Sequence, residues 1–238
     1  MNFKEFLDQA MKEYGITLSE AQLAAFTAYY ELLIEWNEKM NLTAITQPEE
    51  VAVKHMVDSL SCHDESVFKK GCKVIDVGTG AGFPGLPLKL LREDIELTLL
   101  DSLNKRLNFL QSVVEKNALS KVLLVHSRAE DGARKKELRE RFDVAVSRAV
   151  ARLNVLCELC LPYVKPGGYF VALKGAQYEQ EAAEAQNALK TLGAELESIR
   201  KISLPGLEDV RAVLYIKKIK ATPSMYPRRP GALEKKPL

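Results

Sequence analysis

The sequence predicts an α/β protein with a doubly wound, mainly parallel sheet, helices on both faces, a reversed last strand and a helical segment before the sheet. From Cys72 onward, short apolar runs alternate with helical patterns in five strand–helix units, as is typical of parallel sheets. Two further runs, LESIRKISL and VRAVLYIKKIK, are joined only by PGLED, which is too short for a parallel crossover. This pair is therefore expected to be antiparallel.

Residues 1–65 are expected to form a helical cap. In NFKEFLDQAMKEYG the apolar residues recur at helical intervals, and Ser19 can cap a second helix, SEAQLAAFTAYYELLIEWNEKM. The loop NLTAITQ follows. Pro48 then begins a third predicted helix, PEEVAVKHMVDSLSCH, because proline suits the first helical turn.

Residues 66–220 are expected to form the sheet domain, and residues 221–238 a basic tail of the same unit. Besides the antiparallel pair, the predicted strands are CKVIDVG, IELTLLD, KVLLVHS, FDVAVSR and GGYFVALKG. The predicted helices between them are PGLPLKLLRE, LNKRLNFLQSVVEKNA, EDGARKKELRER, RLNVLCELCLPYV and EQEAAEAQNALKTLG. The basic run KKELRER (135–141) is interleaved with acids and is interpreted as a solvated helix face.

Composition narrows the class of protein. No apolar run approaches the roughly 20 residues that span a bilayer, and MNFKEFLDQA lacks the order of a signal peptide. We therefore expect a cytoplasmic protein without a membrane partner, and a monomer, since no coiled-coil pattern is present.

The cysteines are expected to be free thiols. Cys157 and Cys160 lie three apart in an apolar helical pattern, which favours core packing over a metal site, so no metal is predicted.

The charge is unevenly distributed along the chain. From Lys217 to the end there are seven basic residues and one acid, a net charge of +6, whereas the whole chain carries +2. A basic tail on a mildly acidic body indicates a polyanionic partner. A solvated C-terminus is the alternative.

The stretch VIDVGTGAGFPG, residues 74–85, is a candidate cofactor loop. Its Gly80-x-Gly82-x-x-Gly85 follows a predicted strand and opens a helix, and Asp101 ends the next strand, where an acid can hold ribose hydroxyls. Thr79 lies among these glycines. The pattern alone leaves a nicotinamide dinucleotide possible, and with it an NAD-dependent oxidoreductase.

Asp76, at the mouth of this loop, argues for a different cofactor. A dinucleotide places its pyrophosphate at the helix N-terminus, and a carboxylate beside it would repel that anion. S-adenosylmethionine instead carries a sulfonium and an ammonium, which Asp76 would attract, while Asp101 takes the ribose hydroxyls. The alternatives are that Asp76 orders its own loop and that Asp101 caps the following helix.

The motif D-x-G-x-G-x-G after a strand, with an acid ending the next strand, resembles class I S-adenosylmethionine-dependent methyltransferases, whose Rossmann-like sheet has seven strands and a reversed last strand. From about residue 30 onward the chain is similar to the glucose-inhibited division protein B family. The matching motifs are WNEKMNLTAI (36–45), HMVDSL (55–60), DVGTGAGFPGLPL (76–88), DSLNKRLNFL (101–110), HSRAED (126–131), SRAVARL (147–153), LKG (173–175) and YPRRPG (226–231).

This resemblance implies an enzyme that methylates N7 of a guanine in bacterial 16S ribosomal RNA, with the RNA or the small ribosomal subunit as partner. It implies that Gly78 and Phe83 line the cofactor site, that Ala129 and Glu130 flank the adenine, and that Arg148 faces cofactor and substrate together. A structural ion pair is the alternative for Arg148.

The reaction needs little from the protein beyond alignment. Guanine N7 has an in-plane lone pair and no proton to lose, so no general base is required, and holding donor and acceptor in line supplies much of the rate. Arg148 and Lys174 are the predicted catalytic residues, because arginine and lysine favour the O6/N7 edge of guanine. His55 and Asp58, one helical turn apart, form either a polar cluster at the site or a structural pair.

RNA binding is expected to rest on basic residues of the tail, namely Arg228, Arg229, Lys235 and Lys236, which would neutralise phosphates. Asn41 in the helical cap is a further candidate RNA contact, with helix capping as its alternative. An RNA-binding protein with a vestigial cofactor pocket remains a third possible class, although the intact glycines and both acids argue against it.

Overall fold

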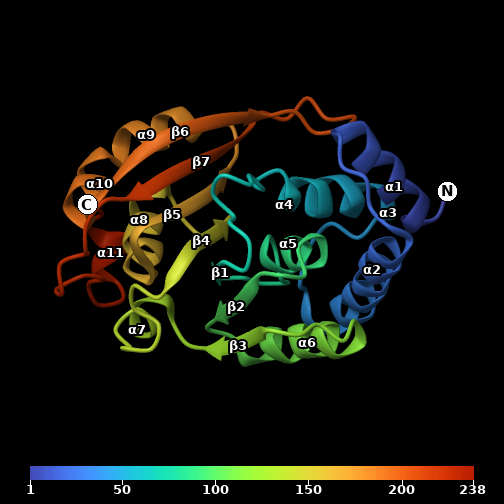
Figure 1. Cartoon of the computed structure of the whole chain (residues 1–238), viewed down its shortest axis with the longest axis horizontal. Coiled ribbons are helices and arrows are strands. Elements are labelled where there is room, and N and C mark those ends of the chain that lie inside the picture. Colours follow the sequence, from blue (N-terminus) through green and yellow to red (C-terminus); the bar gives the residue numbers. More distant parts are fainter.

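A single sheet runs through the whole molecule (Figure 1). The computed structural model describes residues 1–238, apart from the side chain of Glu234. Within them the sheet has seven strands in the order β3-β2-β1-β4-β5-β7-β6. The strands are β1 (Lys73–Val77), β2 (Glu96–Asp101), β3 (Val122–His126), β4 (Phe142–Arg148), β5 (Val164–Lys174), β6 (Ala194–Ile202) and β7 (Arg211–Lys218).

The pairing confirms the predicted topology. Neighbours from β3 to β5 are parallel, whereas β7 runs antiparallel to both β5 and β6. The last strand is therefore reversed, as expected, but it lies between β5 and β6, so β6 forms the edge. Because parallel strands end at the same side, Asp101 and Arg148 reach one edge of the sheet together, and the reversed β7 brings its first residue, Arg211, to that edge.

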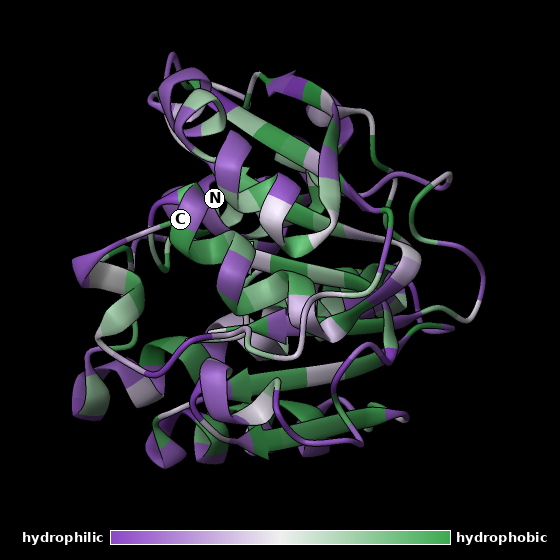
Figure 2. Cartoon of the chain, turned by 90° about the vertical axis from the view of Figure 1, so that its left-hand side faces the viewer, coloured by the Kyte–Doolittle hydropathy of each residue, from purple (hydrophilic) through white to green (hydrophobic). Residues whose placement is uncertain are grey.

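Helices cover both faces of the sheet. One face carries α1 (Phe3–Tyr14), α2 (Glu20–Met40), α3 (Pro48–Val51), η1 (Ala52–Val57), α4 (Asp58–Leu60), α5 (Gly85–Leu91) and α6 (Asn104–Lys116). The other carries α7 (Ala129–Gly132), α8 (Leu153–Cys160), η2 (Leu161–Tyr163), α9 (Tyr178–Glu184), α10 (Gln186–Leu192) and α11 (Ala232–Lys235). Figure 2 shows the strands as hydrophobic bands between these layers, as a sheet buried on both faces requires.

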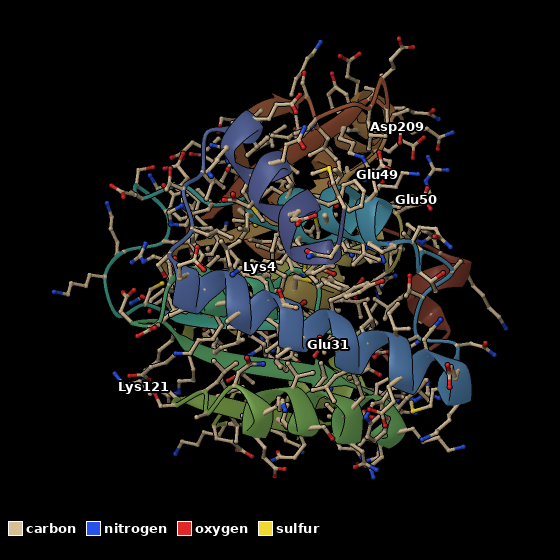
Figure 3. The ribbon with its side chains drawn as sticks, turned by 90° about the vertical axis from the view of Figure 1, so that its right-hand side faces the viewer. Lys4, Glu31, Glu49, Glu50, Lys121 and Asp209 are labelled. Carbon is tan, nitrogen blue, oxygen red and sulfur yellow. The ribbon has the colours of Figure 1, made fainter. Side chains whose placement is uncertain are left out.

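The helical cap shares its core with the sheet. Asn2 and Ser19 each close a capping box, which starts α1 and α2 where the sequence predicts. Phe26 and Tyr29 on α2 are fully buried in a cluster that also contains residues of β1 and β2. Figure 3 shows α2 crossing this side of the molecule, with charged residues such as Glu31 labelled. The cap is thus packed as one wall of the core.

Three predicted helices differ from the structure. The third helix of the cap, which begins at Pro48, is continuous but contains a π-helical turn, η1, at Ala52–Val57. The third predicted helix after the cap, EDGARKKELRER, is reduced to α7, and residues 133–140 form turns and a bend. The interpretation of 135–141 as a solvated helix face is therefore wrong: Arg139 donates to the backbone carbonyls of Thr222 (2.9 Å) and Tyr226 (2.8 Å). The long helix after β5 is divided at Ala185.

The basic tail folds back onto α8. Arg228 donates from its backbone N–H (2.6 Å) and its Nη2 (2.6 Å) to the carboxylate of Glu158, which is 1% exposed. Lys218, which is fully buried, donates to Thr222 Oγ1 (2.6 Å) at the start of the tail. The tail is thus held by long-range polar contacts.

None of the helices in the described residues has the length and apolarity to cross a membrane.

Candidate functional site

The glycine loop between β1 and α5 is organised by Asp76. This carboxylate is fully buried; its Oδ2 accepts from Thr79 Oγ1 (2.8 Å) and Gly85 N–H (2.8 Å), so it joins the two ends of the loop. Its Oδ1 has no hydrogen-bond partner among the described residues. Burial raises the pKa of Asp76 to about 7.

Asp101, at the end of β2, orders the same loop from the other side. Its Oδ2 accepts from Gly80 N–H (2.9 Å), and its Oδ1 accepts from Leu103 N–H (2.8 Å) at the start of α6. Loop ordering, the alternative considered for Asp76, is thus a real contact, whereas the bond from Asp101 reaches the residue just before α6 and does not cap the helix. A carboxylate has about four lone-pair positions, so Asp101 can still accept from a ligand.

A cavity of about 640 Å³ opens above the loop, within the range of small-molecule sites. Of the predicted cofactor residues, those that line it are Gly78, Thr79, Gly80, Phe83, Asp101, Ala129, Glu130 and Arg148. Asp76 and Gly82 lie just outside its lining. A Cβ added at Gly78, where φ is +72°, would come within 2.8 Å of Val150, so a side chain there would collide with the opposite wall.

Aromatic rings form the floor between this cavity and the cap. The ring of Phe83 stacks on His55, with ring centroids 4.5 Å apart, and on Tyr29, with centroids 5.5 Å apart. The guanidinium carbon of Arg148 lies 4.9 Å from the centroid of the same Phe83 ring. Tyr29 also donates to the carbonyl of Ala81, which ties α2 to the glycine loop.

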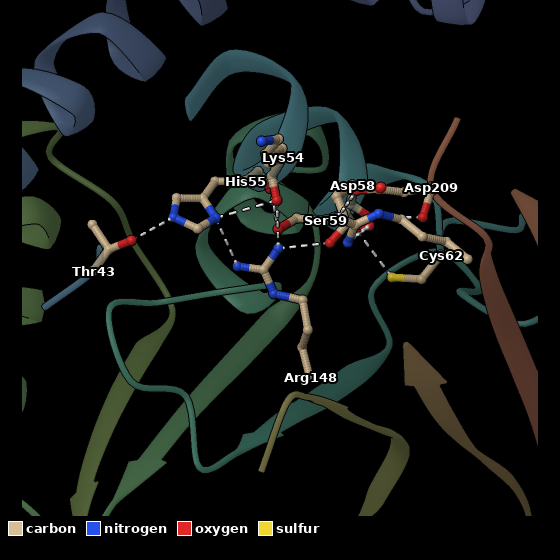
Figure 4. Close-up of polar contacts among 10 residues, drawn as sticks. Thr43, Lys54, His55, Asp58, Ser59, Cys62, Arg148 and Asp209 are labelled. Carbon is tan, nitrogen blue, oxygen red and sulfur yellow. Dashed lines mark hydrogen bonds and ion pairs between the residues drawn. The ribbon is translucent and has the colours of Figure 1, made fainter. Parts of the chain in front are cut away.

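Arg148 is held by the third helix of the cap (Figure 4). Its Nη1 donates to the Lys54 carbonyl (3.0 Å) and to Asp58 Oδ2 (2.7 Å), and its Nη2 contacts His55 Nδ1 at 3.2 Å. The same Nδ1 lies 3.2 Å from the Lys54 carbonyl, and Nε2 lies 2.8 Å from Thr43 Oγ1, so both ring nitrogens of His55 have polar neighbours. Burial, reinforced by Arg148, lowers the pKa of His55 to about 3, so the ring is neutral.

A second cavity, of about 520 Å³, adjoins the first. The two share His55, Arg148, Ala149 and Val150 in their linings. Lys174 lies in the second cavity and is 7% exposed in its side chain; it donates to the Ala151 carbonyl (2.6 Å) and pairs with Glu181 (2.7 Å). The predicted catalytic pair is therefore brought together around one segment, residues 149–152. Ala149 has φ +56°, a conformation uncommon outside glycine and often seen at functional sites.

The predicted RNA contacts lie apart from these cavities. Arg228 is paired with Glu158, which gives this arginine a structural role in holding the tail. Arg229, Lys235 and Lys236 are exposed in the tail. Asn41 is exposed and ends α2 with φ +50°, which matches the capping alternative.

Cys157 and Cys160 are core residues, as the sequence predicts. Both are fully buried and free, and burial raises the pKa of each thiol. A buried, protonated thiol is inert, so the pair takes no part in the site.

Sequence reasoning missed several residues that line the cavities. Arg106 and Arg128 line the first cavity, and Arg152 and Arg211 line the second. Arg128 lies just after the end of β3, in HSRAED, and Arg106 lies in the first turn of α6, which follows β2, in DSLNKR. The rule that ligands sit beyond the carboxyl ends of the strands could have identified them.

A family model and individual relatives of this chain carry the same name. The family model described as rRNA small subunit methyltransferase G matches residues 22–208. The Ribosomal RNA small subunit methyltransferase G of Clostridium perfringens (strain SM101 / Type A) is 51% identical over 238 residues, covering 100% of both chains. The protein of that name from Desulforamulus reducens is 51% identical over 232 residues, covering 98% of this chain and 97% of the relative.

Solved structures show the fold. The crystal structure of a SAM dependent methyltransferase from Aquifex aeolicus superposes with a TM-score of 0.56 at 18% identity, over 75% of this chain and 97% of that chain. The sheet order and this likeness confirm the class I methyltransferase fold. The resemblance found in the sequence motifs is likewise confirmed by the relatives. The chain belongs to the family described as rRNA small subunit methyltransferase G.

Proposed function

We propose that this protein transfers a methyl group from S-adenosylmethionine to N7 of a guanine in small-subunit (16S) ribosomal RNA, as a cytoplasmic monomer. The observation that carries the proposal is the meeting of two cavities at Arg148–Val150, just beyond the carboxyl end of β4. A donor in the glycine-loop cavity and an acceptor in the second would face each other there. The family match supports an rRNA methyltransferase over the nicotinamide-dependent oxidoreductase.

The first cavity fits S-adenosylmethionine. The glycine loop has positive φ at Gly78, Gly80 and Gly82, so its backbone can approach a ligand closely. We infer that Asp101 accepts from the ribose hydroxyls and that Ala129 and Glu130 flank the adenine, since all three line this cavity. The orphaned, buried Oδ1 of Asp76 below the loop suits a cationic ligand and disfavours a pyrophosphate. When bound, the cofactor supplies an electrophilic methyl group on its sulfonium.

Asp76 has a more indirect role in this proposal than the sequence suggested. Asp76 does not line the cavity. Thr79 does line it, and the Thr79 hydroxyl donates to the Asp76 carboxylate. We infer that Asp76 sets the shape of the loop and adds negative charge beneath it. Both effects favour a cation in the cavity.

The second cavity suits a base that gives up no proton. Its two carboxylates, Asp58 and Glu181, are engaged in ion pairs with Arg148, Arg211 and Lys174, and His55 is held neutral as a hydrogen-bonded wall. None of these groups is poised as a general base. N7 methylation requires none, since its lone pair attacks directly. Arg148 and Lys174 remain our candidates for holding guanine O6.

RNA binding is proposed to use the exposed tail residues Arg229, Lys235 and Lys236, and Asn41 in the cap. Arg228 belongs to this proposed set as well, although its charge is shared with Glu158. Exposed basic residues of this kind neutralise phosphates and make binding fall with salt.

The test is to incubate the protein with radiolabelled S-adenosylmethionine and small ribosomal subunits from a strain that lacks it. The labelled RNA is then cleaved chemically at N7-methylguanine. We expect one labelled cleavage site, lost with Arg148→Ala. Label at another atom, or no label despite cofactor binding measured by calorimetry, would refute the proposal.

A further inference from the structure

Asp58 is the first residue of α4 in the helical cap, and its carboxylate contacts side chains from two strands of the sheet (Figure 4). Its side chain is 5% exposed. Its Oδ2 lies 2.7 Å from Arg148 Nη1, at the end of β4, and its Oδ1 lies 3.3 Å from Arg211 Nη1, at the start of β7. Since β5 separates these strands in the sheet, one carboxylate of the cap bridges two cations that the sheet alone would leave apart.

The local helix geometry supports a functional role for this region. Asp58 directly follows the π-helical turn η1, which also carries Lys54 and His55. These three residues supply every hydrogen-bond acceptor that the structure shows for the Arg148 guanidinium within the described residues. Single π-helical turns inside a helix occur frequently at functional sites.

The hydrogen bonds of Arg148 leave one edge of its guanidinium free. The group has five N–H donors. Nη1 uses two, toward Lys54 and Asp58, and Nη2 uses one, toward His55. The N–H of Nε and one N–H of Nη2 have no acceptor among the described residues. Arg148 lines both cavities, so these donors are available where the cavities meet.

We propose that Asp58 is a positioning residue for methyl transfer, acting through Arg148; this rests on the proposed function. Of the three acceptors, only Asp58 carries a charge, and charge-assisted hydrogen bonds are about twice as strong as neutral ones. The Asp58 carboxylate therefore fixes the rotation of the guanidinium and directs its free edge toward the bound base. Asp58 itself lines only the second cavity, so it acts on the acceptor side.

The experiment compares Asp58→Asn with the wild-type enzyme and with Asp64→Asn. The control is another aspartate close by in the chain, which pairs with Arg200 at 3.5 Å and lines neither cavity. In Asp58→Asn we expect kcat to fall roughly ten- to a hundredfold, the scale of a misplaced catalytic group. The dissociation constant for S-adenosylmethionine should stay unchanged. Asp64→Asn should keep wild-type turnover.

A double-mutant cycle tests whether Asp58 acts through Arg148. In an Arg148→Gln background, Asp58→Asn should cause no further loss of kcat, because the group that it positions is gone. A second full loss, or unchanged kcat in the single variant, would overturn the proposal. If Asp58→Asn does not fold, Asp58→Glu keeps the charge and displaces it by one methylene. Full turnover in Asp58→Glu would then overturn the proposal.

One readout does not depend on the acceptor. In the wild-type protein the Arg148 Nε–H should give a distinct cross-peak in a nitrogen-correlated NMR spectrum, because the guanidinium is fixed. Asp58→Asn should broaden that signal or shift it to the position of mobile arginines. An unchanged signal would overturn the positioning role, whereas failure of the wild-type enzyme to label guanine would overturn only the proposed function.

Discussion

Arg228 and Arg229 are adjacent in the tail but differ in their surroundings, which makes them a matched pair for a stability measurement. Arg228→Ala removes three side-chain contacts to Glu158, from Nε at 3.0 and 3.1 Å and from Nη2 at 2.6 Å, and leaves only the backbone N–H at 2.6 Å. Glu158 is 1% exposed, so the variant leaves its carboxylate buried without its counter-charge.

The expected loss of stability in Arg228→Ala follows from the burial of Glu158. Breaking a buried ion pair by removing one partner costs about 3–5 kcal/mol. The Arg228 side chain is itself 24% exposed, so water compensates in part and we expect the lower end, about 3 kcal/mol. For a chain of this size that corresponds to a fall in Tm of roughly 10 °C. Arg229→Ala, on an exposed side chain, should change stability by less than about 0.5 kcal/mol.

Thermal unfolding followed by circular dichroism, with urea titration as a second measure, checks this prediction. Arg228→Ala should melt well below Arg229→Ala. Equal melting temperatures would refute the view that the tail is held in place through Glu158. A salt-dependent loss of RNA affinity in Arg228→Ala, with wild-type stability, would assign the arginine to RNA binding alone.

Three further predictions concern the loop, the cap and the tail. Asp76→Asn should weaken S-adenosylmethionine binding roughly tenfold, because the negative charge beneath the glycine loop is lost. Since the wild-type pKa is about 7, wild-type affinity should fall as pH drops below 7, and calorimetry showing the same pH dependence in Asp76→Asn would contradict the argument. For His55, the folded pKa of about 3 lies below the ordinary 6.5, so its contribution to stability is present above pH 6.5 and lost as pH falls toward 3. In His55→Gln the free energy of unfolding, measured by urea titration, should fall less steeply between pH 6.5 and 3 than in the wild type. Equal pH dependence in the two proteins would exclude a contribution from His55. Replacing Arg229, Lys235 and Lys236 together by alanine should lower the slope of log affinity against log salt by about 2 without changing Tm; an unchanged slope would remove the tail from the RNA surface.

Much of the fold could be predicted because it depends on local pattern. The centre of the strand FDVAVSR is a continuous apolar run, Val144–Val146, as burial on both faces requires. The short link PGLED excludes a parallel crossover between β6 and β7. The glycine loop could be predicted for the same reason, because its glycines follow a strand and precede a helix within one short segment.

The parts that escaped prediction depend on pairs distant in sequence. Glu158 and Arg228 are 70 positions apart, and Asp58 and Arg148 are 90 apart, so no local periodicity relates them. The segment 133–141 has a helical composition, but Arg139 is used to hold the tail, and tertiary contacts override propensity there. The burial of Asp76 below the cavity could not be predicted from the loop pattern either.

The position of β7 between β5 and β6 has a consequence for folding during synthesis. β6 leaves the ribosome before β7, yet it can join the sheet only through β7, since β5 and β6 are not neighbours. Until residue 218 has emerged, β5 is an open edge with unpaired backbone groups, of the kind that invites aggregation. The nascent chain therefore passes through a five-stranded stage that needs protection, and truncation anywhere before β7 would make that exposed edge permanent.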